Sequence, residues 1–564
     1  KNQTDCTLHH TLERCFVKAA ESKGFIRAIL LDEDKHIFSY RSDKLFRHYI
    51  SVPFGLKLKP ALEPNSTVSC DIFDTILCRP FSNPDMVFRF LEEKVAREYG
   101  IDNFYHLRKE SEGRIRKEKG ETGDVKLSEI YSFLQTLAGI DKEKAEQLQK
   151  LEVDMEIRIL EARERVREAL TDMKSKGNRV VLTSDTYMED EDIRKILSEK
   201  GLGSFDSLYI SSEIGKRKDR GDLWDHIIEE EKAERKKPIY HIGDNEESDL
   251  HILFEKNIAE LVKPIHIMKP SILFRHFDVG KYFYNKIMPE KGWRESLFYG
   301  LLSDYFCSDP DAVKLYGMEY PLSDPHAFGY AVFGPMLYNF MIWLIKTARE
   351  DGIDELKFIA REGFLLNQLY ETVIQALREE GCGDGFPRGD YFLCSRRAAI
   401  FASIRNKEDI ELMLDRYFNG TIGDFISNRI HLDNMEEVAS ALGKNLLNTG
   451  ISLPRDKRYL MKHMENIAEL VIRQAAEERD AMRKYCRDQR MDGKSKIGFV
   501  DLGYSGNIQK SLSKLLGMQI AGYYFVTDIM AEQLLRSGMI CRGYYGEFID
   551  ARTKKIPIYK YQLL

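Results

Sequence analysis

The sequence lacks any pair of cysteines in CxxC spacing, although it contains nine cysteines in 564 residues. This absence removes the spacing typical of structural zinc sites and of redox-active cysteine pairs. The cysteines are scattered and odd in number, so they do not indicate a disulfide framework. We therefore expect a reduced protein of the cytoplasm.

An excess of positive charge is also missing. The 85 Lys and Arg residues are outnumbered by 91 Asp and Glu residues, which gives a formal net charge of −6. Proteins that bind nucleic acid usually carry a basic footprint on one face. We therefore do not expect nucleic acid as a partner.

The chain has no long apolar run that is free of helix-breaking residues. Residues 327–345 carry no charge and are long enough for a membrane span, but Gly329, Gly334 and Pro335 interrupt them. We predict two buried helical pieces that meet at the Gly-Pro pair, and no membrane span.

No signal peptide precedes the first motifs, and the first residue is Lys1 rather than Met. We expect a fragment in which residues 1–65 form an N-terminal segment, a candidate remnant of a preceding domain. Within it, residues 25–40 read as a β-hairpin.

The clearest functional signal is a short apolar strand that ends in acidic residues. The run from Val68 to Cys70 leads into Asp71, and Asp74 and Thr75 follow. Ligands of parallel α/β sheets bind beyond the carboxyl ends of the strands, so Asp71 is expected to point into a site. A strand that ends in a simple Asx turn would show the same local pattern.

Three further apolar runs in this half, at residues 180–182, 207–210 and 239–242, alternate with helical patterns. Such alternation predicts βαβ units and a largely parallel sheet. The polar residues that follow the three runs are Ser184, Lys218, Asp244 and Asp249.

An acid, a hydroxyl, a cation and an acid pair at neighbouring strand ends suit phosphoryl transfer. Asp71 can attack phosphorus and form an aspartyl-phosphate. Ser184 can hold a phosphoryl oxygen, and Lys218 can offset negative charge. Asp244 and Asp249 offer the hard oxygen ligands that Mg²⁺ prefers.

This order of motifs resembles the haloacid dehalogenase (HAD) superfamily. The matching segments are Asp71-Ile-Phe-Asp-Thr75, Leu182-Thr-Ser184-Asp, Lys218, and Gly243-Asp244-Asn-Glu-Glu-Ser-Asp249. A helical insertion at about residues 80–177 lies where the family places a type 1 cap. The resemblance implies a Rossmann-like hydrolase domain over residues 66–270. It also implies a Mg²⁺ site made by Asp71, the backbone carbonyl of Phe73, Asp244 and Asp249.

The sequence departs from the family at one catalytic position. Phosphatases of the superfamily carry a second Asp two residues after the nucleophile, where this chain has Phe73. Phe73 keeps the backbone carbonyl but lacks the carboxylate that transfers a proton. Asp74 can replace that carboxylate or can cap the turn, and both roles stay open. Lys216 competes with Lys218 for the third motif, although spacing favours Lys218.

The second half predicts another α/β domain. Residues 271–350 read as a helical connector, and residues 351–564 as an α/β domain with a helical insertion at about 407–490. Apolar runs at residues 356–360, 391–394, 497–500 and 520–526 are the expected strands. Polar clusters follow three of them, and the residues are Arg361, Arg396, Arg397, Asp501, Gly503, Ser505 and Gly506.

These clusters predict a second site for an anion. Glycines beside a helix N-terminus let backbone N–H groups approach an anion, and arginines supply forked contacts to phosphate or carboxylate. The alternative is that Arg361 and Arg397 form structural ion pairs and that Gly503 and Gly506 only make a tight turn. The loops weakly resemble those of phosphoribosyltransferase-like domains, but Asp501 lacks the usual adjacent acid.

We predict a Mg²⁺-dependent phosphatase or phosphotransferase for a small sugar or polyol phosphate. The combination of domains is similar to large bacterial proteins of surface polysaccharide synthesis, which implies a phosphorylated metabolite and a partner enzyme of that process. The alternative is a binding or regulatory module, with a glycosyl- or phosphoribosyl-type transferase in the second half.

Overall fold

A computed structural model of the chain describes residues 52–120, 123–235, 238–287, 292–313, 324–414 and 417–549. The chain divides into two compact units, with the boundary between residues 323 and 324. Most of the predicted N-terminal segment 1–65, including the expected hairpin at residues 25–40, lies outside the described residues.

The first unit contains a five-stranded parallel sheet in the order β5-β4-β1-β6-β7, with β1 at its centre. Its strands are β1 (Thr67–Cys70), β4 (Arg179–Ser184), β5 (Ser207–Ile210), β6 (Ile239–Gly243) and β7 (Val262–His266). Cys70 lies between Leu182 and Ile242 in the register of this sheet. The α/β fold with a parallel sheet is therefore confirmed, and β7 is a strand that the sequence analysis missed.

Helices cover both faces of this sheet because successive side chains of a strand point to opposite faces. Val180 and Leu182 pack in one apolar layer, whereas Val181 packs in the other. The helices of the sheet domain are α4 (Phe54–Lys57), η1 (Lys59–Leu62), α9 (Glu164–Ser175), α10 (Asp190–Glu199), α11 (Ser211–Ile214), α12 (Asp222–Arg235), η2 (Glu246–His251) and α13 (Ile252–Glu255).

Four helices between β1 and β4 form a separate cap with its own apolar core. They are α5 (Met86–Tyr99), α6 (Phe104–Lys119), α7 (Leu127–Ala138) and α8 (Lys142–Ile159). The short antiparallel strands β2 (Leu77–Cys78) and β3 (Glu161–Ala162) join the cap to the sheet domain. Residues 124–127, which we call the cap loop, are hydrogen-bonded to the sheet domain. Ser211 Oγ donates to Asp124 Oδ2 at 2.6 Å, and the Leu127 N–H donates to the Tyr187 carbonyl at 2.7 Å.

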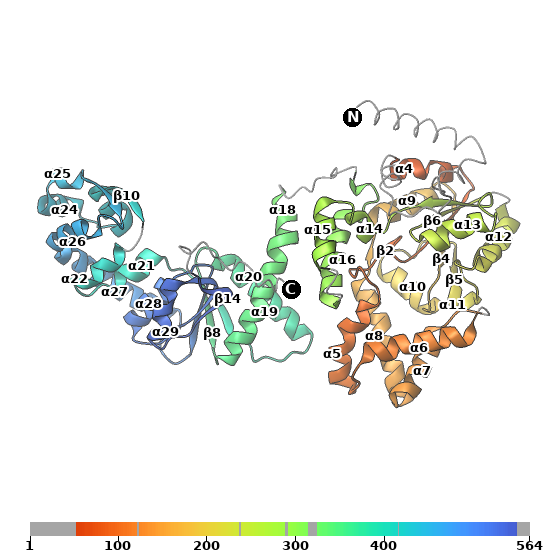
Figure 1. The fold of residues 1–564 in the computed structure, drawn as a ribbon, viewed down its shortest axis with the longest axis horizontal. Coiled ribbons are helices and arrows are strands. Elements are labelled where there is room, and N and C mark those ends of the chain that lie inside the picture. The colour runs from red at the N-terminus through yellow and green to blue at the C-terminus, as the bar shows by residue number, and fades with distance from the viewer. Residues whose placement is uncertain are drawn as a thin grey trace, which may run out of the picture. The chain divides into compact units, whose positions relative to one another are not determined.

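After β7 the chain forms α14 (Pro270–Phe274), α15 (Asp278–Ile287) and α16 (Trp293–Cys307). Helix α16 contacts both α14 and the cap helix α5. It passes close to the segment after β2, where a Cβ on Gly300 would lie 2.2 Å from the Pro80 carbonyl oxygen. The Ser82 N–H donates to the Ser296 carbonyl at 3.1 Å. The strands β2 and β3, which join the cap to the sheet domain, form the hinge between them. Helix α16 therefore bridges the cap and the sheet domain beside this hinge (Figure 1).

The second unit contains another five-stranded parallel sheet, in the order β14-β13-β12-β8-β9. Its strands are β8 (Glu355–Ile359), β9 (Arg388–Phe392), β12 (Ile497–Asp501), β13 (Ala521–Asp528) and β14 (Cys541–Ile549). Four of these strands follow the apolar runs predicted from the sequence, whereas β14 was not predicted. Strand β9 begins and ends earlier than expected, and Leu393 beyond its end is 64% exposed.

Helices also cover both faces of this sheet. Phe358 faces α19 (Gly334–Glu350) and α20 (Gly363–Glu379), whereas Phe499 faces α21 (Arg396–Ala402), α27 (Ala468–Asp488) and α28 (Asn507–Leu516). After β13 come η8 (Ile529–Ala531) and α29 (Glu532–Arg536).

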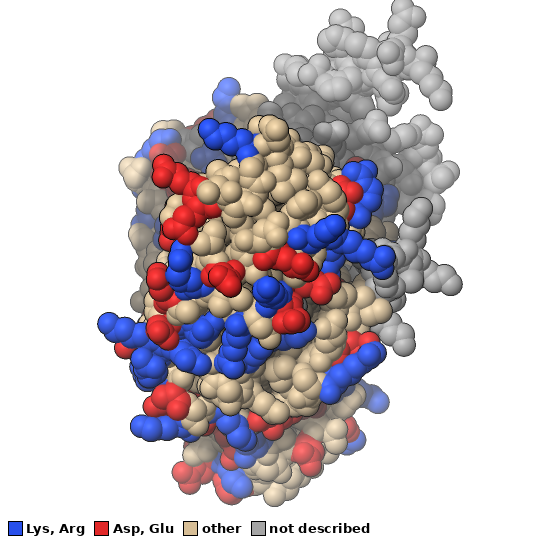
Figure 2. Space-filling view, turned by 90° about the vertical axis from the view of Figure 1, so that its left-hand side faces the viewer, with Lys and Arg blue, Asp and Glu red and all other residues tan. Residues whose placement is uncertain are grey.

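An insertion between α21 and α27 has an apolar core of its own. Its elements are α22 (Lys407–Ile410), η5 (Glu411–Met413), β10 (Phe418–Thr421), α23 (Ile422–Phe425), η6 (Ile426–Ile430), α24 (Met435–Leu442), α25 (Lys444–Leu447), β11 (Gly450–Leu453), α26 (Lys457–Met464) and η7 (Glu465–Ile467). Figure 2 looks onto this insertion, and the Lys and Arg side chains on the face that it shows are interspersed with Asp and Glu.

The apolar stretch at residues 327–345 differs from the prediction of two buried pieces. Helices α18 (Pro325–Phe328) and α19 are joined by the π-helical turn η4 (Gly329–Phe333) into one run, Pro325–Glu350. The wide turn precedes Pro335, which has no N–H to donate. Only 28% of the most apolar window of this run is buried. Among the described residues, it is the one helix long and apolar enough to cross a membrane.

The close approach of α16 to the hinge segment yields a test of packing. We expect Gly300→Ala to lower the free energy of unfolding by about 1–3 kcal/mol, because a methyl group there would press on the Pro80 backbone. Gly113→Ala is the matched control, since it lies within α6 with nothing within 4 Å of its Cβ. This control is expected to stabilise by up to about 1 kcal/mol. Equal unfolding midpoints for both variants would contradict the prediction.

Candidate active site

Asp71 stands at the carboxyl end of the central strand of the first sheet. Its N–H donates to the Ile242 carbonyl at 2.8 Å, which extends the pairing of β1 with β6 by one residue. Asp71 is only 6% exposed. Ser184 is buried and is the last residue of the neighbouring strand β4. It lies two residues beyond Leu182, which pairs with Cys70. The two residues therefore lie at the same edge of the sheet, as predicted.

Lys218 joins two of the predicted acids. Its Nζ lies 2.6 Å from Asp71 Oδ1 and 2.6 Å from Asp249 Oδ1, and the side chain is buried. The loop that carries Lys218 is fixed by Asp185, which accepts hydrogen bonds from the backbone N–H groups of Lys218 and Asp219. These contacts identify Lys218 as the lysine that reaches the acids.

The acids and the lysine strongly affect one another. Burial alone would lower the pKa of Lys218, but Asp249 and Asp71 outweigh burial and raise it. Burial alone would raise the pKa of Asp249, but Lys218 and His241 hold it below its usual range. For Asp71, burial is opposed by Lys218 and reinforced by Asp249, and the pKa rises to about 7.

Asp244 is linked to Asp71 through Thr75, a residue that the site prediction omitted. Thr75 Oγ1 donates to Asp244 Oδ1 at 3.0 Å and lies 3.3 Å from Asp71 Oδ2. Burial, reinforced by Asp74 and Asp71, raises the pKa of Asp244 well above its usual range. The position of Thr75, four residues after Asp71 in the same loop, was the available signal for its role.

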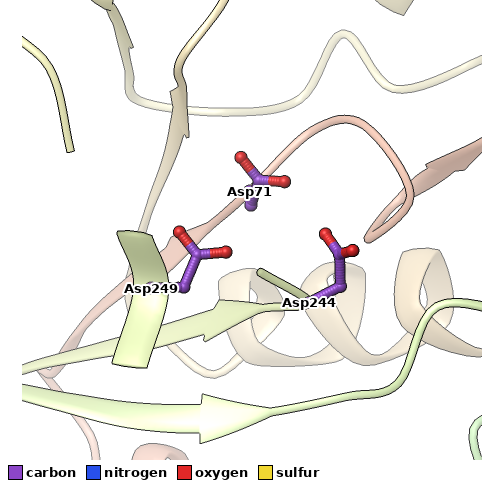
Figure 3. Close-up of side chains that lie close together, drawn as sticks. All are labelled: Asp71, Asp244 and Asp249. Atoms are coloured by element: carbon purple, nitrogen blue, oxygen red, sulfur yellow. The ribbon is translucent and has the colours of Figure 1, made fainter. Parts of the chain in front are cut away.

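Asp71, Asp244 and Asp249 can together hold a cation. Each offers one carboxylate oxygen, and these oxygens all lie within 4.8 Å of one another. The three side chains face a common space at the ends of β1 and β6 (Figure 3). Three hard oxygen donors with mutually unfavourable charge suit a divalent ion such as Mg²⁺. The Phe73 carbonyl stays a predicted ligand.

Asp74 is held in an ion pair. Lys269 Nζ donates to Asp74 Oδ2 at 2.6 Å, and Arg163 donates to the Asp74 carbonyl at 3.1 Å. Burial alone would raise the pKa of Asp74, but the charges of Lys269, Arg79 and Arg163 keep it below its usual range. An ionised, paired carboxylate is a poor proton donor, so this geometry favours the structural role of Asp74.

The residues around Asp74 were not predicted from the sequence. Lys269 follows the missed strand β7, and Arg163 follows β3 at the base of the cap. Asp304 of α16 belongs to the same group, and burial, reinforced by Asp74, raises its pKa. The Phe73 ring lies under the Arg79 guanidinium at 4.1 Å. These residues come from distant segments, so no local pattern identifies them.

The structure places the residues predicted for a second site differently from one another. Arg396 and Ser505 line a cavity of about 550 Å³ in the second unit, together with Asn507, which was not predicted. An adjoining recess is lined by Arg396, Asp501, Gly503, Ser505 and Gly506. Arg397 borders the cavity but pairs with Glu478, as its structural alternative stated. Arg361 is exposed and borders neither space.

No protein-family model and no curated protein sequence matches this chain. Solved structures similar to it include a 2-haloacid dehalogenase from Pseudomonas syringae, with 16% identity, 35% of this chain and 85% of that chain covered, and a TM-score of 0.27. A protein named as a β-phosphoglucomutase from Thermotoga maritima has 15% identity, covers 37% and 96%, and has a TM-score of 0.26. A HAD hydrolase from Bacillus subtilis, solved with magnesium, has 13% identity, covers 38% and 98%, and has a TM-score of 0.27.

The raised pKa values of Asp71 and Asp244 predict that Mg²⁺ binding releases protons. A group with a pKa of about 7 is mostly protonated below that pH, and a cation needs the ionised carboxylate. We expect Mg²⁺ to bind roughly tenfold more weakly at about pH 6 than at about pH 8.

Calorimetric titration with Mg²⁺ in two buffers of different ionisation enthalpy measures both the affinity and the proton release. Asp244→Asn is expected to weaken binding at both values of pH. The exposed Asp172, on α9, supplies the control variant Asp172→Asn, which should bind like the wild type. An affinity independent of pH, without proton release, would contradict the prediction.

Proposed function

We propose that the first unit is a Mg²⁺-dependent phosphatase or phosphotransferase that works through an aspartyl-phosphate on Asp71. The observation that carries the proposal is the position of Lys218, 2.6 Å from both Asp71 and Asp249 at the edge of the sheet. The four motifs that resemble the HAD superfamily support the same reaction class.

In the proposed reaction, an Asp71 carboxylate oxygen attacks phosphorus, and the bond from phosphorus to the ester oxygen of the leaving group breaks. Water, or a second alcohol, then attacks the phosphorus of the aspartyl-phosphate, and the Asp71 carboxylate is restored. Ser184 holds a phosphoryl oxygen, and Lys218 offsets the charge of the nucleophile and the phosphoryl group. When bound by Asp71, Asp244 and Asp249, Mg²⁺ supplies further neutralisation of phosphoryl charge.

The proposed site has no proton donor for the leaving group at position 73 or 74. Phe73 has no proton to give, and Asp74 is ionised and paired with Lys269. General acid catalysis is worth roughly a hundred- to ten-thousand-fold in rate. The proposed enzyme therefore cleaves a sugar or polyol phosphate without a proton donor at these two positions, and its rate rises with the acidity of the leaving group.

The proposed substrate is a small sugar or polyol phosphate. The low exposure of Asp71 and the fastening of the cap loop by Asp124 and Leu127 favour a small molecule over a macromolecule. A role in surface polysaccharide synthesis, with a partner enzyme of that process, extends the sequence resemblance. The proposed location is the cytoplasm, in keeping with the seven free thiols among the described residues.

A binding or regulatory module is the second candidate for the first unit, and the Phe73 side chain beside a paired Asp74 favours it. Such a module would bind Mg²⁺ and a phosphate mimic without turnover. The main activity would then belong to the second unit, as a glycosyl- or phosphoribosyl-type transferase that depends on Asp501.

Phosphate release from a panel of phosphorylated metabolites tests the proposal. We expect release by the wild type that requires Mg²⁺ and that falls at least about a thousandfold in Asp71→Asn, because the nucleophile is lost. Asp172→Asn, which removes an exposed carboxylate of α9, should retain the wild-type rate. Binding of Mg²⁺ and of a phosphate mimic without any release would favour the second candidate.

The leaving group gives a second test. We expect aryl phosphates and acyl phosphates to react at least about a hundredfold faster than alkyl phosphates, because their leaving groups depart without a proton donor. The steady-state kcat/KM for a series of esters with graded leaving-group acidity measures this dependence. A rate that is flat across the series would show that another group supplies the proton.

A further inference from the structure

The second unit contains a cavity that the proposed function does not use. It measures about 550 Å³ and lies between the helices α21 and α28 of the α/β domain and the elements β10, α23 and η6 of the insertion. This volume is typical of sites for small molecules. Its lining combines apolar side chains with basic ones.

Two buried nitrogens of a half-buried arginine in this lining lack acceptors among the described residues. The Nε and Nη1 atoms of Arg396 are buried and have no hydrogen-bond partner within the part of the chain that the structure describes. Its neighbour Arg397 differs, because it donates to Glu478 and to the Ile430 carbonyl. A buried guanidinium N–H without an acceptor is costly, so the geometry of Arg396 indicates an acceptor supplied by a ligand.

The N-terminus of α28 faces the same place as Arg396. Arg396, Ser505 and Asn507 line both the cavity and the adjoining recess. Gly506 precedes α28 with a φ of 62°, and a Cβ there would lie 2.3 Å from Leu534 Cδ1, so the tight turn into the helix requires glycine. The N–H groups at the start of a helix favour an anion.

The charge of the lining is also favourable for an anion. Lys510 donates to Gln533 rather than to a carboxylate, and Arg429 stacks on Phe418. The described residues give neither side chain an acidic partner. Lys514 is different, because Asp409 accepts its hydrogen bond at 2.5 Å. The lining holds five basic side chains against two acidic ones, Glu408 and Asp409, so the cavity keeps a positive surplus.

Apolar side chains complete the lining and indicate the rest of the ligand. They are Ile400, Met413, Phe418, Phe425, Met530 and Leu534. An inorganic anion would not use this surface, whereas an organic molecule that carries a phosphate would use both parts.

We propose that this cavity binds a small organic phosphate, with its phosphate group on Arg396 and the N-terminus of α28 and its organic part against Phe418 and Phe425. The site is independent of the Asp71 site, since every lining residue belongs to the second unit.

Calorimetric titration of the full chain with inorganic pyrophosphate, in the presence of EDTA, tests the anion-binding part. We expect Arg396→Gln to weaken binding between about tenfold and a hundredfold, as charge-assisted hydrogen bonds are lost. Lys510→Gln is expected to weaken it several-fold. Lys484→Gln removes the same charge from an exposed position of α27 outside the cavity and should change the affinity less than about twofold. Thermal unfolding checks that each variant is folded.

Hydrogen exchange locates the bound probe. Pyrophosphate is expected to slow amide exchange in residues 503–514 of the wild type and not in Arg396→Gln. Absence of binding to the wild type, equal weakening in Lys484→Gln, or protection centred on residues 71–75 would each overturn the proposal. If Arg396→Gln does not fold, an unchanged affinity in Lys510→Gln would overturn it alone.

The organic part is tested by competition. Aryl phosphates should displace pyrophosphate more strongly than inorganic phosphate does, and Phe418→Ala should reduce that advantage at least about threefold. Equal displacement by inorganic phosphate and by the aryl esters would overturn the assignment of an organic ligand.

Discussion

The first unit depends on one buried ammonium group between two carboxylates. The Lys218 side chain is buried away from water. Burying a charge without partners costs roughly several kcal/mol. Asp71 and Asp249 compensate this loss at 2.6 Å each, and the loop of Lys218 is fixed in turn by Asp185. The same contact determines the electrostatics of the site. It holds the pKa of Asp249 below its usual range and opposes the rise in the pKa of Asp71 that burial causes.

The parts of the fold that follow from local patterns could be predicted from the sequence. Apolar runs such as residues 180–182 alternate with helical patterns, and this is sufficient to place Asp71, Ser184 and Asp244 at one edge of a parallel sheet. Strands β7 and β14 were missed because Pro264 interrupts one run and because glycines and charged residues weaken the other. The glycines and the proline within residues 327–345 led to the prediction of two separate helical pieces. A π-helical turn instead accommodates Pro335 within a single helix.

The site shows a similar division. The four motif positions could be predicted from the sequence because each follows a strand. The environment of Asp74 could not. Lys269 and Arg163 donate hydrogen bonds to Asp74 from two distant segments, and Asp74 raises the pKa of Asp304 from a third. Only the folded chain brings these residues together. In the second unit the sequence predicted three arginines for one site. Their surroundings separate them, since Arg397 is held by Glu478 whereas the buried nitrogens of Arg396 lack acceptors within the described structure.

The position of α16 constrains how the cap of the first unit can move. The helix contacts both α5 of the cap and α14 beside the sheet, and Gly300 approaches the backbone of Pro80 next to the hinge strand β2. Contacts with α16 therefore restrict rotation of the cap about β2 and β3. An opening motion has to separate Gly300 from Pro80 or carry α16 along.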